Sequence, residues 1–244
     1  MSALAGQTVL ITRSDDDCMG WADALAAAGA TPVVLPCIRC ETLATDELRE
    51  RIDAELPHTD WLVFTSKRGV TAFTALCKRP VPDSVKVAVI GPATADTAVI
   101  AFGRADLTSE SGTAVSLAQA LEARFSDTGA RLLVAIAENA GTTIEDTLRA
   151  AGATCTRLDV YRTLAAEPRE PKQALSVLGA DNIFLASPSA VTGLTNQVEL
   201  DKPAAIFTIG PATNEAAEAA GLTVAGQATS PGLEGLMEAM RCAT

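Results

Sequence analysis

The chain has 244 residues, of which 48% are hydrophobic and 20% charged, the composition of an ordinary globular protein. Its net charge of −11 argues against general nucleic-acid binding, and makes the binding of an acidic ligand depend on local donors. No apolar run approaches the roughly 20 residues of a membrane span, and the N-terminus lacks the basic and apolar regions of a signal peptide. We therefore expect a cytoplasmic protein with no nucleic-acid or membrane partner.

Short β-branched runs alternate with alanine-rich stretches along the whole chain, as in successive βα units. The first half predicts strands at 8–13, 32–36, 61–65, 85–90 and 105–107, and helices at 16–28, 44–55, 68–78, 92–102 and 112–125. After a turn at 126–129, the second half predicts strands at 131–136, 154–160, 182–186, 204–209 and 222–225, and helices at 142–151, 170–178, 188–198, 211–220 and 231–241. Continuous apolar strands indicate parallel sheets covered on both faces, so we predict a doubly wound α/β fold with the strand order of flavodoxin.

The two halves repeat one another. The segment at 9–13 recurs at 132–136, the segment at 64–70 at 185–191, the pentapeptide Ile-Gly-Pro-Ala-Thr of 90–94 at 209–213, and Thr108-Ser109 at 229–230. Offsets of 119 to 123 residues are too long for a solenoid. The repeat predicts two related domains, one sheet from each half, with a ligand cleft between them.

Matching polar residues stand where a buried strand meets the next helix. Ser66 and Ser187 occupy N-cap positions, and Gly-Pro hinges precede Thr94 and Thr213. Because the carboxyl ends of parallel strands form the binding edge, and helix starts offer free N–H groups, this pattern favours an anionic ligand. The predicted binding residues are Arg13, Thr65, Ser66, Gly91, Thr94, Ser187, Ser189, Gly210 and Thr213. The alternative is that the serines only cap helices and the glycines only form turns.

Tyr161 is the only tyrosine and follows a predicted strand in the second half. The only histidine, His58, lies in a polar loop, which argues against a Ser-His-Asp triad and multi-histidine metal sites. The phenol of Tyr161 is then the leading neutral proton donor, although the ring could also serve only in packing. Arg13 ends the first strand, where it is either a counter-charge for the ligand or part of a surface ion pair.

Of the six cysteines, only Cys37 and Cys40 have a CxxC spacing. A zinc ribbon needs a second such pair, which is absent, and a redox CxxC normally opens a helix rather than ending a strand. We expect reduced structural thiols; a thiol redox protein is the alternative reading.

Several of these motifs together resemble the uroporphyrinogen-III synthase family. They are Val-Leu-Ile-Thr-Arg at 9–13, Phe-Thr-Ser-x-x-Gly-Val at 64–70, Ile-Gly-Pro-Ala-Thr at 90–94 and 209–213, Val-Tyr-Arg-Thr at 160–163 and Ala-Ser-Pro-Ser-Ala-Val at 186–191. The resemblance implies two flavodoxin-like domains joined by a two-stranded β-ladder. Residues 1–36 with 164–244 would form a discontinuous domain, 40–158 the second, and 36–40 and 159–163 the linkers.

The resemblance also implies an activity. Members of the family close hydroxymethylbilane, a linear tetrapyrrole, into uroporphyrinogen III with inversion of ring D and loss of water, without metal or organic cofactor. Tyr161 matches the family tyrosine thought to assist departure of the hydroxyl group. The implied partners are the bilane and, transiently, the preceding pathway enzyme, and the implied state is a monomer. Glu138 departs from the basic stretch that family members often carry at this position.

A different class of function remains open. The same two domains could bind a polycarboxylate small molecule without transforming it, as a binding or regulatory module. Tyr161 and the matched hydroxyl residues favour the enzyme, because binding alone requires no proton donor.

Overall fold

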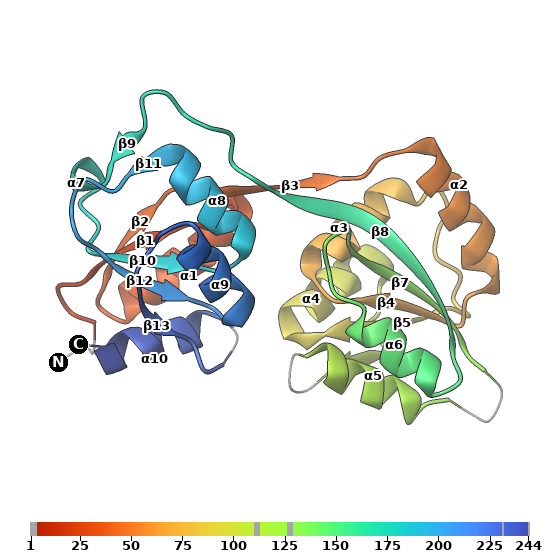
Figure 1. The fold of residues 1–244 in the computed structure, drawn as a ribbon. Coiled ribbons are helices and arrows are strands. Elements are labelled where there is room, and N and C mark those ends of the chain that lie inside the picture. Colours follow the sequence, from red (N-terminus) through yellow and green to blue (C-terminus); the bar gives the residue numbers. More distant parts are fainter. Residues whose placement is uncertain (1–3, 110–112, 126–128, 231, 244) are drawn as a thin grey trace. The chain divides into compact units, whose positions relative to one another are not determined.

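The computed structural model describes residues 4–109, 113–125, 129–230 and 232–243. It divides into two compact units, Met1–Cys40 with Thr163–Thr244 (unit 1) and Glu41–Arg162 (unit 2). Figure 1 follows the chain through both units by colour. Residues 126–128 of the predicted turn lie outside the described residues.

Unit 1 is a parallel sheet with helices on both faces. Its sheet runs in the order β2-β1-β10-β12-β13, with strands β1 (Thr8–Ile11), β2 (Thr31–Val34), β10 (Asn182–Leu185), β12 (Ala205–Thr208) and β13 (Val224–Gln227). One face packs against α1 (Asp15–Ala27) and α10 (Leu233–Ala243), and the other against α7 (Leu175–Leu178), α8 (Pro188–Gln197) and α9 (Pro211–Ala219). A small parallel pair, β9 (Gln173–Ala174) and β11 (Val198–Glu199), lies beside α7 and α8.

Unit 2 has the same layers. The parallel strands of its sheet are β4 (Trp61–Phe64), β5 (Lys86–Ile90), β6 (Leu107–Ser109), β7 (Arg131–Ala137) and β8 (Thr154–Ala165), in the order β8-β7-β4-β5-β6, and β3 (Ile38–Thr42) joins the sheet beside β8. Helices α2 (Asp46–Glu55), α3 (Lys67–Leu76) and α4 (Gly91–Phe102) cover one face, and α5 (Ala114–Glu122) and α6 (Thr143–Ala150) the other. A short 3-10 helix, η1 (Leu56–His58), follows α2. All side chains of β4 are buried, as expected of a strand covered on both faces.

Both sheets have the predicted strand order of flavodoxin. In unit 1 the strands follow the order 2-1-3-4-5 when counted along the chain. Unit 2 has the same order if β7 and β8 are counted as its first two strands and β4, β5 and β6 as its third, fourth and fifth. The parallel α/β class is therefore confirmed, but the prediction of one sheet from each half is wrong. Each sheet takes its first two strands from one half and its last three from the other.

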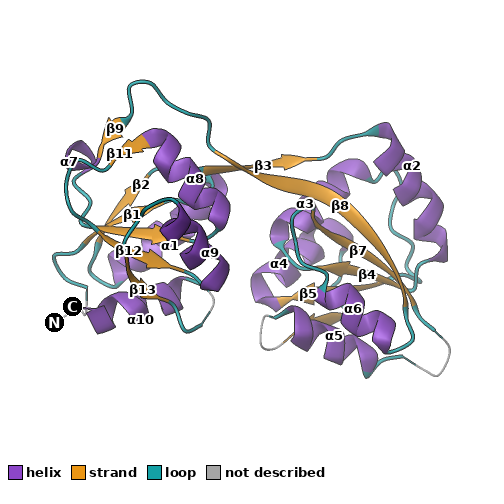
Figure 2. Cartoon of the chain, in the orientation of Figure 1, coloured by secondary structure: helices purple, strands orange, loops and turns teal. Residues whose placement is uncertain are grey.

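The exchange uses two chain segments that pair with each other. Strand β3 (Ile38–Thr42) neighbours β8, which continues to Ala165 instead of ending at the predicted residue 160 (Figure 2). Backbone hydrogen bonds join Ala166 N to Cys37 O (2.8 Å) and Leu43 N to Val160 O (3.0 Å), so the two strands run in opposite directions. This pairing explains why both segments are extended.

One predicted helix is wrong. Residues 170–178 form only β9 and the single turn α7. Pro171 lies in the first turn of this segment and Pro168 just before it, and a residue that precedes proline avoids the helical conformation. The stretch 167–172 is also exposed, so no apolar face holds it on the sheet.

Candidate functional site

The carboxyl edge of the unit 2 sheet gathers the predicted residues of that unit. Phe64 at the end of β4 pairs with Ala135 on one side and Val89 on the other, so the three strands finish at nearly the same level. Thr65 and Ser66 follow Phe64 directly, and Gly91 follows β5. Parallel strands thus place these residues along one edge.

Ser66 and Tyr161 are in direct contact at this edge. Their hydroxyl oxygens are 3.0 Å apart, and either can donate the hydrogen bond. Ser66 is the N-cap of α3, as predicted: its Oγ accepts a hydrogen bond from the N–H of Gly69 at 3.0 Å. A serine oxygen that accepts from the helix can still donate its own proton to the phenol.

A shift in strand pairing sets the direction of the Tyr161 side chain. Ile136 pairs with Asp159, but Ala137 pairs with Tyr161, so Val160 has no opposite residue. Val160 packs on the face covered by α3, and strict alternation would turn Tyr161 to the other face. The shift places the half-buried Tyr161 ring against the same core as Val160, on the side of Ser66.

Close backbone packing holds α3 at this edge. A Cβ atom added to Gly69 would lie 3.0 Å from the backbone oxygen of Ala135 in β7. Glycine at this position lets the first turn of α3 approach the neighbouring strand. The prediction left Gly69 out of the site, although its spacing from Ser66, Ser-x-x-Gly, was a usable signal.

Gly91 and Thr94 begin α4. Gly91 has a φ of 69°, a left-handed conformation that favours glycine, which explains the Gly-Pro hinge. Thr94 is only 6% exposed, so its side chain faces the fold. Thr65 is half-buried beside Ser66.

The acidic residue that departs from the family pattern is exposed. Glu138 directly follows β7, and its backbone N–H donates to the carbonyl oxygen of Tyr161 at 2.8 Å. Its side chain faces solvent, while its peptide group connects the β7–α6 loop to the strand that carries the phenol.

Unit 1 has an equivalent edge without a tyrosine. Ser187 is the N-cap of α8, as predicted, and accepts the N–H of Ala190 at 3.1 Å. Ser189 is half-buried in the first turn, and Gly210 precedes Pro211 at the start of α9. Thr213 is 3% exposed and, like its counterpart in unit 2, turns its side chain inward.

Arg13 lies just beyond β1 and is held on two sides. Its guanidinium bonds Asp17 at 3.0 Å and lies 4.7 Å from the centre of the Trp21 ring. The Nε atom is buried and has no hydrogen-bond partner in the described part of the chain. The ion pair that the sequence offered as an alternative role for Arg13 is therefore present, but it does not use the Nε donor of the guanidinium.

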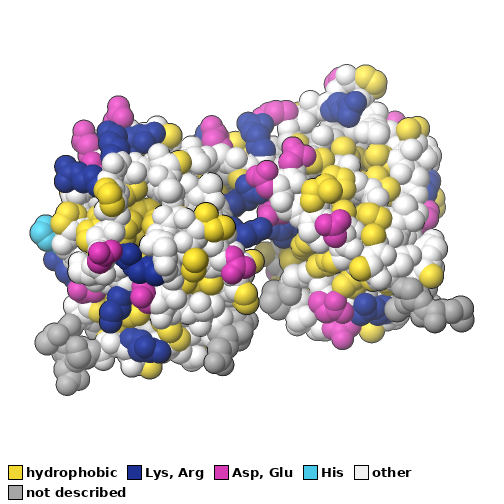
Figure 3. All heavy atoms as spheres, turned by 180° about the vertical axis from the view of Figure 1, so that it is seen from behind, with side chains coloured by type: hydrophobic (Ala, Val, Ile, Leu, Met, Phe, Trp, Pro, Cys, Tyr) yellow, Lys and Arg dark blue, Asp and Glu magenta, His cyan; other side chains and the backbone are white. Residues whose placement is uncertain are grey.

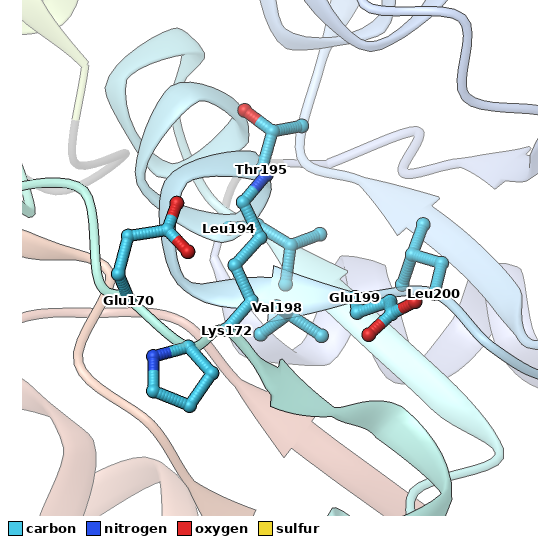
Figure 4. Close-up of a pocket in the computed structure, with 8 residues that line it drawn as sticks. Glu170, Lys172, Leu194, Thr195, Val198, Glu199 and Leu200 are labelled. Carbon is cyan, nitrogen blue, oxygen red and sulfur yellow. The ribbon is translucent and has the colours of Figure 1, made fainter.

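A hollow in unit 1 lies away from these residues. A pocket of about 570 Å³ is lined by Glu170, Lys172, Leu194, Thr195 and Glu199 among others (Figure 4). Leu194 and Thr195 belong to the C-terminal half of α8, whereas Ser187 caps the opposite end. None of the predicted site residues lines this pocket.

The cysteines have the environments of structural thiols. Burial raises the pKa of the Cys18 thiol to about 11 and that of Cys37 to about 12, the opposite of what a redox cysteine requires. Cys40 lies within β3 rather than at a strand end, and all six cysteines are free. Within the described ranges, no group of three His, Cys, Asp or Glu residues could hold a metal ion.

This gives a prediction for thiol chemistry. When the native protein is treated with iodoacetamide at pH 8, the exposed Cys242 should be alkylated, whereas Cys18 and Cys37 should remain protonated and unmodified. Peptide mass mapping before and after denaturation checks this. In the folded state the pKa values of both thiols are raised above the ordinary 9.0. The stability that depends on the protonated thiols is therefore fully present below pH 9 and is lost as the pH rises toward 12. Rapid alkylation of native Cys37 would contradict the structural assignment.

Comparisons with known proteins agree on one family. A family model described as Uroporphyrinogen-III synthase HemD matches residues 20–238. The chloroplastic uroporphyrinogen-III synthase of rice, Oryza sativa subsp. japonica, is 29% identical over 189 residues, which span 74% of this chain and 62% of the rice protein.

Solved structures of low sequence identity share the fold. Uroporphyrinogen-III synthetase from Helicobacter pylori is 14% identical with a TM-score of 0.65, over 98% of this chain and all of the other. A mutant uroporphyrinogen III synthase from Thermus thermophilus is 16% identical with a TM-score of 0.56, over 98% of each chain. In the part of the chain that the structure describes, no helix is long and apolar enough to cross a membrane.

Proposed function

Because the chain belongs to the uroporphyrinogen-III synthase family, we propose that it cyclises hydroxymethylbilane to uroporphyrinogen III, with inversion of ring D and loss of water. The match of the family model over residues 20–238 is the observation that carries this proposal. The Tyr161–Ser66 pair gives it a chemical basis in the residues of this chain.

The reaction begins with the loss of a hydroxyl group. The carbon–oxygen bond of the ring A hydroxymethyl group breaks as Tyr161 transfers its proton to the departing oxygen, which leaves as water. Ser66, which contacts the phenol at 3.0 Å, donates to the phenolate oxygen as its charge develops. The pyrrole nitrogen supplies the electrons, and ring A becomes an azafulvenium cation, the protonated form of an azafulvene.

The remaining steps need orientation more than acid–base groups. Ring D attacks this cation through its substituted carbon, giving a protonated spiro pyrrolenine that breaks and recloses with ring D reversed. The proton that ring D loses on closure restores the phenol of Tyr161. The proposed reaction requires no metal or organic cofactor, because the pyrroles supply and receive the electrons.

A polycarboxylate substrate needs local donors on an acidic protein. On the face shown in Figure 3, acidic and basic side chains are interspersed. We assign substrate carboxylates to the helix starts after Ser66, Gly91, Ser187 and Gly210, where N–H groups and the helix dipole favour anions. Arg13, whose side chain is 28% exposed, would bind one carboxylate in unit 1.

We expect this chemistry in the cytoplasm. The expectation comes from the sequence of this chain; the rice relative is named chloroplastic.

The isomer formed from hydroxymethylbilane tests the proposal. The bilane would be generated in situ by the preceding pathway enzyme, and the oxidised products separated by chromatography. We expect the type III isomer to predominate when this protein is present, and type I, the spontaneous product, in its absence. Type I alone at every protein concentration would reject the enzyme. Tight bilane binding with type I alone would support the non-catalytic binding module instead.

A further inference from the structure

Arg157 has an unusual number of polar contacts for a residue outside the predicted site. It lies on β8, four residues before Tyr161, and only 20% of its side chain is exposed. Its Nη1 bonds Glu145 Oε1 at 2.8 Å and its Nε bonds Asp159 Oδ1 at 2.7 Å. Glu145 is only 1% exposed, so its charge depends on Arg157 for compensation.

The other contacts of Arg157 go to the backbone of the β7–α6 loop. Nη2 donates to the carbonyl oxygens of Ala137 (2.9 Å), Ala140 (3.0 Å) and Glu138 (3.3 Å). One guanidinium therefore fixes three peptide groups in a stretch of four residues. A planar fork of five donors suits this arrangement, whereas a lysine ammonium could satisfy fewer of the carbonyls.

These contacts lie where the strand pairing shifts. Ala137 is the residue that pairs with Tyr161 after the shift, and its carbonyl is held by Arg157. The next peptide N–H, that of Glu138, donates to the Tyr161 carbonyl at 2.8 Å. A continuous chain of contacts thus leads from Arg157 through residues 137 and 138 to the backbone of Tyr161.

We propose that Arg157 is a positioning residue that, through the β7–α6 loop, holds the shifted register of β7 and β8 and so keeps the phenol of Tyr161 on Ser66. Glu145 holds Nη1 and Asp159 holds Nε, while Nη2 donates to the carbonyls of residues 137, 138 and 140. Arg157 reaches the reaction only through Tyr161, so the effect on catalysis rests on the proposed function.

Two readouts test this inference, and one of them requires no substrate. Since Tyr161 is the only tyrosine, protein labelled with tyrosine carrying ¹³C at Cζ gives a single NMR signal from the phenol. We expect Arg157→Met to shift or broaden this signal and to lower kcat by on the order of 10²-fold, the cost of misplacing a reacting group by about 1 Å. KM should change little, because Arg157 touches none of the proposed binding residues.

Controls separate positioning from general destabilisation. Arg149→Met removes a half-exposed arginine of α6 that contacts Asp146 and Cys155 and none of the loop carbonyls, and should leave both readouts unchanged. Arg157→Lys keeps a cation against the buried Glu145, and should show an intermediate effect. It also carries the test if Arg157→Met does not fold.

A double substitution gives the sharpest outcome. If Arg157 acts through the phenol, adding Arg157→Met to Tyr161→Phe should slow the reaction no further. Additive losses, or an unchanged Tyr161 signal in folded Arg157→Met and Arg157→Lys proteins, would overturn the proposal. If the unsubstituted protein forms no type III isomer but the Tyr161 signal still moves in the Arg157 variants, the proposed function fails while the positioning contact stands.

Discussion

Replacing Tyr161 by phenylalanine should lower kcat by roughly 10²-fold, the low end of what a positioned general acid contributes. The substitution removes the hydroxyl that Ser66 contacts at 3.0 Å and keeps the ring that packs on the core of unit 2. KM should stay close to its original value, because the phenol is assigned to the departing hydroxyl group rather than to a substrate carboxylate. Steady-state rates of type III formation, corrected for the spontaneous type I product, measure both constants.

Ser66→Ala is the matched control for this prediction. It leaves the phenol in place but removes the donor that would stabilise a phenolate, and a hydrogen bond to a charged group contributes about 1.5–3 kcal/mol. Because the phenol itself stays, we expect the lower end of this range, a loss of about 10-fold, which is smaller than that of Tyr161→Phe. Full activity in Tyr161→Phe would assign proton transfer to solvent or to a carboxylate of the bilane.

Local sequence patterns were sufficient for the parts of the site that depend on helix starts. Ser66 and Ser187 were predicted as N-caps from their position between an apolar run and a helical stretch, and both accept the expected backbone N–H. The parallel sheets followed from the same alternation of apolar runs and helices. These features depend on contacts within a few residues, which the sequence displays directly.

Features set by long-range pairing could not be obtained in this way. Equivalent strands of the two halves have similar sequences, so nothing local decides that β10 pairs with β1 rather than β7. The face on which Tyr161 lies depends on a register shift opposite β7, which strict alternation predicts wrongly. The importance of Arg157 follows from the burial of Glu145, twelve residues away in sequence. The ligand cleft expected between the two domains stays a prediction.

Gly193→Ala should strongly destabilise unit 1, although it adds only one methyl group. A Cβ atom at this position of α8 would lie 1.7 Å from the carbonyl oxygen of Cys37 and 3.1 Å from the backbone N of Ala166. Because both neighbours are backbone atoms, no side-chain rotation relieves the clash, and α8 must move away. We expect the free energy of unfolding to fall by about 3 kcal/mol, the upper end for overpacked sites.

Gly20→Ala in α1 is the matched control, because a Cβ atom there meets nothing within 4 Å. This substitution should raise the free energy of unfolding by about 0.5–1 kcal/mol, since alanine favours a helix more than glycine does. Urea unfolding followed by tryptophan fluorescence resolves the units, because Trp21 lies in unit 1 and Trp61 in unit 2. Trp61→Phe and Trp21→Phe backgrounds isolate each reporter.

The contact at Gly193 also links stability to the proposed chemistry. Around it, α8 holds both segments that cross between the units: Asn196 Nδ2 donates to Ala166 O at 2.8 Å, and Gln197 Nε2 to Pro36 O at 2.9 Å. The same helix begins at Ser187, one of the proposed carboxylate-binding starts. A displaced α8 should therefore raise KM in whatever fraction of Gly193→Ala remains folded, with the Trp21 transition shifted and the Trp61 transition nearly unchanged. Equal midpoints for Gly193→Ala and Gly20→Ala would mean that α8 does not pack on Cys37 in solution.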